Sequence, residues 1–265
     1  METSLQSPAI NLKQRIARQF GRAAADYDHC ADVQWHIAQD ALQLLPASDG
    51  MVLDIGAGTG KVTRAMLPLH AKVIGLDLAE GMLKYAQQQA RESNAHSLSW
   101  VAGDGEKLPF LDNSFEALFS SMALQWCGLG VFSECYRVMK PAARGVVAIM
   151  SQGSFQQWQQ CWQQIDSRQH INQFPSHVSL QQAAERAGFA VKASQREYMT
   201  YHPDVRQLLG SIKSIGANVV TETANAVPLT RRSLAELNRQ YEQYRNEQGL
   251  LPLGYRISFL QLHKR

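Results

Sequence analysis

Apolar and polar residues follow two different periods along the first part of the chain. Short apolar runs, which predict strands, are separated by stretches in which apolar residues recur every three to four positions, the period of an amphipathic helix. Strands that alternate with helices favour a parallel sheet with helices on both faces, so the pattern predicts an α/β fold. The predicted strands cover residues 51–55, 72–77, 98–103, 116–121 and 145–150, and the predicted helices cover 60–67, 80–93 and 130–139.

The two ends of the chain carry other patterns. Residues 12–45 follow a helical period, with a break near Tyr27 and a second helix from about residue 32. After residue 150 the composition changes, and aromatic residues at helical spacing lie within a glutamine-rich stretch. Further elements are predicted as a helix over 180–187, a strand over 189–201, two or three helices within about 203–250, and a last strand over 254–263.

A glycine-rich turn follows the first predicted strand. Asp54 closes that strand, and Gly56, Gly58 and Gly60 alternate with other residues before a helix begins. Glycines are needed where a ligand approaches the backbone more closely than a Cβ allows. Alone, such a turn is a weak signal, because many turns are rich in glycine.

Acidic residues follow the next two strands and strengthen this signal. Asp77 ends the second strand, seventeen residues after Gly60, where an acid can accept hydrogen bonds from a ribose diol. Asp104 follows the third strand after a glycine. Each acid could instead be a simple helix cap or turn residue. Their common place at the carboxyl ends of parallel strands, where ligands bind in open α/β sheets, favours a binding site.

An acid followed by G-x-G-x-G resembles motif I of the class I S-adenosylmethionine (SAM) methyltransferases, which have a Rossmann-like fold. The resemblance implies a seven-stranded, mostly parallel sheet that an antiparallel last strand closes. It also implies that Gly56 and Gly58 pass under the methionine part of SAM, while Asp54 lies near the methionine amino group or orders the loop. Asp77 would bind the ribose. The implied cofactor-binding residues are Asp54, Gly56, Gly58, Gly60, Asp77, Leu78, Met82, Asp104, Gly105 and Ser121.

Two domains are expected on this basis. Residues 1–46 would form an N-terminal helical arm, and residues 47–265 would form the methyltransferase domain, with the helical insertion at about 203–250 contributing to the acceptor site. The arm would lie across the cofactor as a lid, as N-terminal helices do in many such enzymes. Plain core packing of Phe20 and Tyr27 is the alternative.

Motifs outside the glycine loop resemble one family, the malonyl-acyl-carrier-protein O-methyltransferases of biotin synthesis. The resemblance implies that a methyl group passes from SAM to the free carboxylate of a malonyl thioester, held on the carrier protein or on coenzyme A. The loop itself reads Gly-Ala-Gly-Thr-Gly, where some members have Gly-Cys-Gly-Pro-Gly. The matching segments are 20–27, 124–127, 211–218 and 229–231.

A carboxylate acceptor explains why no base motif is evident among the eight histidines. At neutral pH a carboxylate is already ionised and needs no general base. The enzyme must instead hold a carboxylate oxygen in line with the methyl group, at about 3–3.5 Å. A cation would fix it first, and each candidate could instead be a solvated surface charge. The candidates are Lys213, Arg22 and Arg256 as cations and Tyr27, Gln125 and Trp126 as pocket walls.

Composition narrows the remaining choices. The net charge of +3 is too small to indicate nucleic acid, and no apolar run or N-terminal signal indicates a membrane or secretion. The four cysteines have no metal-binding spacing, so we expect no metal and reduced thiols in a cytoplasmic protein. We further expect a monomer. An acidic carrier protein bearing malonyl-phosphopantetheine would be steered by a basic rim. The arginines available for this rim are Arg15, Arg18, Arg22, Arg231, Arg232 and Arg239.

Three other functions stay open. The first is a SAM methyltransferase that acts on another small acid or on a carbon of a quinone precursor or sterol. The second is a non-catalytic SAM-binding module, against which the intact motif argues. The third, a nicotinamide dehydrogenase, is disfavoured because the G-x-G-x-G spacing does not suit a pyrophosphate.

Overall fold

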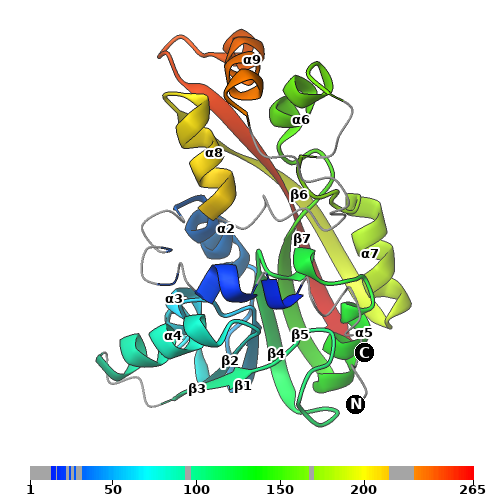
Figure 1. Ribbon diagram of the computed structural model, residues 1–265. Coiled ribbons are helices and arrows are strands. Elements are labelled where there is room, and N and C mark those ends of the chain that lie inside the picture. The colour runs from blue at the N-terminus through cyan, green and yellow to red at the C-terminus, as the bar shows by residue number, and fades with distance from the viewer. Residues whose placement is uncertain are drawn as a thin grey trace, which may run out of the picture. The chain divides into compact units, whose positions relative to one another are not determined.

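The structure is a computed structural model of residues 1–265, of which 13–15, 17–21, 24, 27, 32–92, 97–166, 170–214 and 230–265 are described (Figure 1). The chain divides into two compact units. The first unit comprises residues 1–149, 178–194 and 259–265, and the second comprises 150–177 and 195–258.

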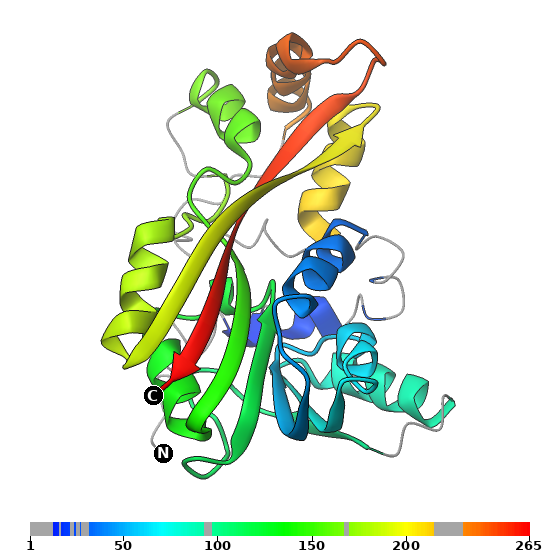
Figure 2. The same cartoon turned by 180° about the vertical axis from the view of Figure 1, so that it is seen from behind.

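Seven strands form one sheet, in the order β3-β2-β1-β4-β5-β7-β6. The pairs β1–β2, β1–β4, β2–β3 and β4–β5 are all parallel, whereas β6 and β7 run in opposite directions (Figure 2). The predicted seven-stranded, mostly parallel sheet is therefore confirmed. The strands are β1 Ser48–Ile55, β2 His70–Asp77, β3 Leu98–Ala102, β4 Phe115–Ser121, β5 Met139–Met150, β6 Phe189–His202 and β7 Leu251–Lys264.

The helices lie mostly where the sequence predicts them. Helices α3, α4 and α5 connect strands of the sheet, α2 precedes the first strand, and α8 and α9 fall within the predicted insertion. Residues 215–229 of that insertion lie outside the described residues. The helices are α2 Asp32–Leu42, α3 Lys61–Ala65, α4 Glu80–Glu92, α5 Val131–Val138, α6 Gln156–Gln163, α7 His177–Arg186, α8 Val205–Ser214 and α9 Arg231–Tyr241, with 3-10 turns η1 Leu124–Trp126 and η2 Glu242–Tyr244.

The core of the first unit lies on both faces of the parallel strands. In β1, Leu53 and Ile55 join one buried cluster with side chains of α5 and α7, while Val52 points to the other face and is equally buried. Successive side chains of a strand alternate between faces, and a strand covered on both faces is apolar throughout. This explains why residues 51–53 of β1 form a continuous apolar run rather than an alternating pattern.

The fifth strand begins earlier than the sequence predicts. The prediction placed a helix over 130–139 and the strand from Gly145, but α5 ends at Val138 and β5 begins at Met139. Pro141 ends the helix as expected, because the residue before a proline avoids the helical region. The chain then pairs with β4 through an irregular register between Phe115 and Ala117. A proline is tolerated at such an irregularity because it has no N–H to contribute to the ladder.

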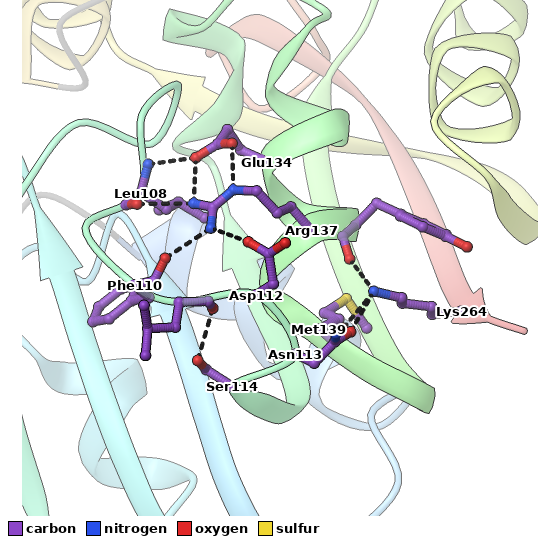
Figure 3. A network of polar contacts seen from close by, with 11 residues as sticks. Leu108, Phe110, Asp112, Asn113, Ser114, Glu134, Arg137, Met139 and Lys264 are labelled. Atoms are coloured by element: carbon purple, nitrogen blue, oxygen red, sulfur yellow. Dashed lines mark hydrogen bonds and ion pairs between the residues drawn. The ribbon is translucent and has the colours of Figure 1, made fainter.

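A polar network ties α5 to the connection between β3 and β4 (Figure 3). Arg137 donates from Nε and Nη2 to the two carboxylate oxygens of Glu134, at 2.7 and 2.8 Å, and its two Nη atoms also reach Asp112 and the carbonyl oxygens of Leu108 and Phe110. Paired hydrogen bonds to a carboxylate fix the guanidinium in one plane. This arginine therefore holds the turn-rich connection that follows the third strand.

Lys264 is a second fixed point in the same region (Figure 3). Its ammonium donates to the carbonyl oxygens of Tyr136 and Met139, at 2.8 and 2.7 Å, and to Oδ1 of Asn113 at 2.9 Å. The residue is buried, and burial lowers its pKa. Three acceptors satisfy all three ammonium donors, which makes the buried charge tolerable and anchors the end of β7.

The second unit has an aromatic interior. The indole of Trp158 packs against Trp162 and Tyr241, with ring centroids 5.8 and 6.5 Å apart, so that α6 meets α9. Arg256, a predicted candidate for the acceptor cation, donates from Nε to Glu197 at 3.0 Å within this unit. In the described part of the chain, no helix is both long and apolar enough to cross a membrane.

Candidate functional site

A pocket opens in the first unit at the carboxyl ends of β1, β2 and β4. This is the edge of the sheet at which the sequence predicts a cofactor site. Eight of the ten predicted cofactor-binding residues line it, as do two of the predicted acceptor residues. They are Gly56, Gly58, Asp77, Leu78, Met82, Asp104, Gly105 and Ser121, with Tyr27 and Trp126.

The glycine loop needs glycine because of its backbone conformation and, at two positions, because of close neighbours. Gly56, Gly58 and Gly60 all have positive φ, at 79°, 54° and 73°, a region that other residues rarely adopt. A Cβ on Gly56 would lie 2.0 Å from that of Ala123, and one on Gly60 would lie 2.4 Å from the indole of Trp100. At Gly58 a Cβ would meet nothing within 4 Å, so this glycine leaves open pocket beside the backbone.

Asp77 joins the glycine loop to the start of α4. Its Oδ2 accepts a hydrogen bond from the Gly58 N–H and its Oδ1 accepts one from the Ala79 N–H, both at 2.8 Å. Burial raises the pKa of this half-buried carboxyl, and the backbone hydrogen bonds from Ala79, Gly58 and Leu78 oppose the rise. Each carboxylate oxygen has two lone pairs, so Asp77 retains acceptors for hydroxyl groups of a ligand.

Asp54 and Gly60 are the two predicted cofactor residues that do not line the pocket. Asp54 is 2% exposed, and its Oδ2 accepts a hydrogen bond of 2.6 Å from the hydroxyl of Thr63 in α3. Burial raises its pKa to about 7, partly opposed by Thr63 and reinforced by the charge of Asp77. This contact ties the end of β1 to α3, and the two roles that the resemblance implies for Asp54 stay predictions.

Asp104 has a partner that sequence reasoning missed. Lys13, from the N-terminal segment, donates to its Oδ2 at 2.6 Å and also pairs with Glu106. Burial lowers the pKa of Lys13, but the hydrogen bonds to Asp104 and Glu106 outweigh burial, so the net pKa is raised. No sequence pattern links Lys13 to Asp104, because the two residues are 91 positions apart in the chain.

The described residues of the N-terminal segment cover one side of the pocket. Phe20 lies between Tyr27 and Trp126, with ring centroids 6.1 Å from each. The backbone of Gly21 meets that of Gly81 in α4, where a Cβ on Gly81 would lie 2.7 Å from the carbonyl oxygen of Gly21. The absence of a side chain at Gly81 therefore permits this close crossing. That the segment opens and closes as a lid stays a prediction.

The other predicted acceptor residues are placed differently. Gln125 follows the pocket residue Leu124, and its Nε2 donates back to the carbonyl oxygen of Met122 at 2.7 Å. Lys213 lies exposed in α8 of the second unit, and Arg231 and Arg232 begin α9 there. Arg22 lies outside the described residues. The roles of all five residues stay predictions.

The pocket also contains residues that were not among the predicted site residues. Gln34, Trp35 and Ala38 of α2 line it, together with Lys61, whose ammonium lies 4.8 Å from the ring centroid of Trp35. Cys127 completes another part of the wall, and burial followed by the nearby charge of Glu106 raises the pKa of its thiol to about 12. Only the helical stripe of α2 could have indicated Gln34, Trp35 and Ala38, and that stripe is equally typical of ordinary core packing.

Part of the chain matches a known domain family, and its fold resembles a solved structure. A family model described as "Methyltransferase domain" matches residues 53–147. The solved structure of the YcgJ protein from Bacillus subtilis superposes with a TM-score of 0.63 at 17% identity, covering 86% of this chain and 97% of that one, a likeness of fold alone. The family model therefore indicates a methyltransferase domain, and the observed sheet gives it a Rossmann-like fold.

The chain belongs to the malonyl-[acyl-carrier protein] O-methyltransferase family. It is 33% identical to the protein of that name from Marinomonas sp. over 258 residues, which are 95% of this chain and 94% of that protein. The predicted class, a SAM-dependent methyltransferase, is thereby confirmed. The chain spans about half the length of other relatives, such as the biotin biosynthesis bifunctional protein BioHC of Cellvibrio japonicus, with 36% identity over 95% of this chain and 50% of that protein.

Proposed function

We propose that this chain transfers a methyl group from SAM to the free carboxylate of a malonyl thioester carried by an acyl-carrier protein. The observation that carries the proposal is the likeness to malonyl-[acyl-carrier protein] O-methyltransferases over nearly the full length of both chains. The product, a malonyl methyl ester, would hide the charge of malonate and let chain-elongating enzymes with apolar pockets accept it. In the cell this would serve the synthesis of biotin.

The residues of the pocket suit such a cofactor. Gly58 leaves room beside the backbone, and Asp77 retains hydrogen-bond acceptors for the hydroxyls of a ribose. Asp104 stands at the next strand end, where the family resemblance expects the adenine. Bound SAM supplies an activated methyl group, and the pocket residues need only bind it, orient it and exclude water.

The acceptor side of the pocket suits a nucleophile that brings its own charge. Cys127 is the thiol of the pocket wall, and a pKa of about 12 keeps it protonated at neutral pH, so it is not a thiolate nucleophile. A malonyl carboxylate is ionised without help from a base. Phe20, Tyr27 and Trp126 provide an aromatic wall that would exclude water from the reacting atoms.

The carrier protein and its site are part of the same proposal. Lys213 would hold the acceptor carboxylate, and Arg231 and Arg232 would guide the acidic carrier. Both arginines are exposed at the start of α9. Reversing the charge of Arg231 and Arg232 should slow turnover of the carrier-protein substrate more than turnover of malonyl-coenzyme A. Lys213→Ala should raise the Michaelis constant for either malonyl thioester and leave SAM affinity unchanged. Equal slowing of both substrates by the charge reversal would count against carrier docking. Unchanged kinetics of Lys213→Ala would show that Lys213 does not hold the acceptor carboxylate.

The deciding experiment measures methyl transfer from labelled SAM to malonyl-acyl-carrier protein, with the acetyl and succinyl forms as controls. Label on the malonyl form, little on the succinyl form and none on the acetyl form would establish methylation of a short diacid. Binding of SAM without label on any of them would reject the malonyl acceptor and leave another small acid, or a binding function, to be tested.

A further inference from the structure

Gln34 lies in the wall of the pocket, and its amide has no partner among the described residues. The residue lies in the first turn of α2 and is 8% exposed. Neither its Nε2 nor its Oε1 is accessible to solvent or hydrogen-bonded to any described residue. An unsatisfied buried amide is destabilising, because its hydrogen bonds to water are lost without replacement. Such a group in a ligand pocket is explained when a bound ligand satisfies it.

Lys61 supplies a charge in the same pocket. It begins α3, directly after the glycine loop, and its ammonium lies over the ring of Trp35, the neighbour of Gln34 in α2. The pocket's other lysine, Lys13, is already paired with Asp104 and Glu106. Among the described residues Lys61 is in no ion pair, so its charge stays available to a ligand that reaches this part of the pocket.

We propose that Gln34 and Lys61 bind a carboxylate of the bound ligand. An amide N–H and an ammonium are both donors to a carboxylate, and the amide oxygen can in addition accept from an ammonium group of the ligand. Trp35 and Ala38 line the pocket as well, and the shielding that they provide strengthens an ion pair relative to water.

The inference rests on the proposed function for the identity of the ligands, which bring two carboxylates. One belongs to the methionine end of SAM, and the other is the free carboxylate of the malonyl group. The place of Lys61 directly after the glycine loop, where the resemblance puts the methionine part, favours the cofactor's carboxylate. The two sources are separable by ligands that carry only one of the groups.

The test uses Gln34→Met and Lys61→Met in the full chain, with binding measured by calorimetry. S-adenosylhomocysteine carries the amino-acid end, whereas 5′-methylthioadenosine keeps the adenosine and lacks that end. Each substitution should weaken binding of S-adenosylhomocysteine by about 10-fold or more, the value of a charge-assisted hydrogen bond, and change binding of methylthioadenosine by less than about twofold. Neither ligand requires an acceptor, so this result is independent of whether malonyl is the substrate.

The stability of the ligand-free Gln34→Met variant provides a second readout. Methionine has a similar shape and no buried amide, so removal of the unsatisfied group should raise the thermal midpoint by about 2–4 °C while affinity falls. A residue with a purely structural role would lose stability and affinity together. Gln34→Glu places a negative charge at the same position and should weaken S-adenosylhomocysteine more than Gln34→Met does.

Each outcome decides the proposal. Weaker S-adenosylhomocysteine with unchanged methylthioadenosine assigns the pair to the methionine carboxylate. Unchanged cofactor binding with a roughly 10-fold higher Michaelis constant for the malonyl thioester assigns it to the acceptor. Equal weakening of both nucleoside ligands, or no change in any of the three measurements, overturns the inference.

Discussion

Replacement of Asp54 by asparagine should change how stability depends on pH. Asp54 is buried below the glycine loop, and burial raises its pKa from the ordinary 3.8 to about 7, against the hydrogen bond from Thr63. The folded protein therefore binds a proton at this site that the unfolded chain has released. The pKa of Asp54 is higher in the folded protein than in the unfolded chain. The contribution of this carboxyl to the free energy of unfolding is therefore fully present below pH 3.8 and is lost as the pH rises to about 7.

The size of the effect follows from the two pKa values. They differ by about three pH units, and each unit corresponds to about 1.4 kcal/mol of unfolding free energy. Wild-type protein should thus lose up to about 4 kcal/mol between pH 4 and pH 8 through this carboxyl alone. Asparagine cannot ionise and its oxygen can still accept from Thr63, so Asp54→Asn should lack this loss.

Urea denaturation of both proteins without ligand, followed by tryptophan fluorescence at several pH values between about 4.5 and 8.5, measures the difference. The variant should gain stability relative to wild type as pH rises and should reach a plateau above pH 7. Asp49→Asn, at an exposed carboxylate of the same strand, is the matched control and should follow the wild-type curve. Parallel curves for Asp54→Asn and wild type would refute the raised pKa.

Three further substitutions test the site and its frame. Asp77→Ala should weaken SAM binding by about 1–3 kcal/mol, and unchanged affinity in calorimetry would remove this carboxylate from the cofactor site. Gly81→Ala should displace the N-terminal segment and weaken SAM binding, because its Cβ would lie 2.7 Å from the carbonyl oxygen of Gly21. Gly21→Ala is the control and should leave SAM binding intact, because its Cβ would lie at an ordinary 3.5 Å from the Cα of Gly81. Equal affinities of the two variants would contradict a close approach of the two backbones. Arg137→Lys should lower the unfolding free energy by about 2 kcal/mol in urea, because lysine cannot make the paired bonds to Glu134, whereas an unchanged midpoint would make the network of little consequence.

The elements that the sequence predicts well are those that local chemistry alone determines. The positive φ at Gly56, Gly58 and Gly60 needs glycine wherever the rest of the chain lies, so the turn is visible in the sequence. Asp77 is likewise identifiable, because an acid at the carboxyl end of a strand in an α/β pattern lies at the edge of the sheet where ligands bind. Tertiary contacts decide the rest.

Gln34 shows what sequence patterns cannot reveal. A glutamine in an amphipathic helix normally points to solvent, and only the packing shows that this one is buried with no partner in the described part of the chain. The pairing of Lys13 with Asp104 depends in the same way on where the N-terminal segment crosses the sheet. The early start of β5 at Met139 was missed because the pairing of β4 with β5, rather than the Lys140–Pro141 sequence, determines where that strand begins.

The order of strands in the sheet has a consequence for synthesis of the chain. β7 is the last strand to be made, yet it lies between β5 and β6. Within the described sheet β7 is the neighbour of β6, and β6 has no second one. The strand at residues 189–202 therefore cannot pair until residues 251–264 have left the ribosome. The first unit also needs residues 259–265, which follow the whole second unit. The two units therefore cannot fold one after the other as they emerge, and an unpaired β6 is the segment most open to wrong pairing in the meantime.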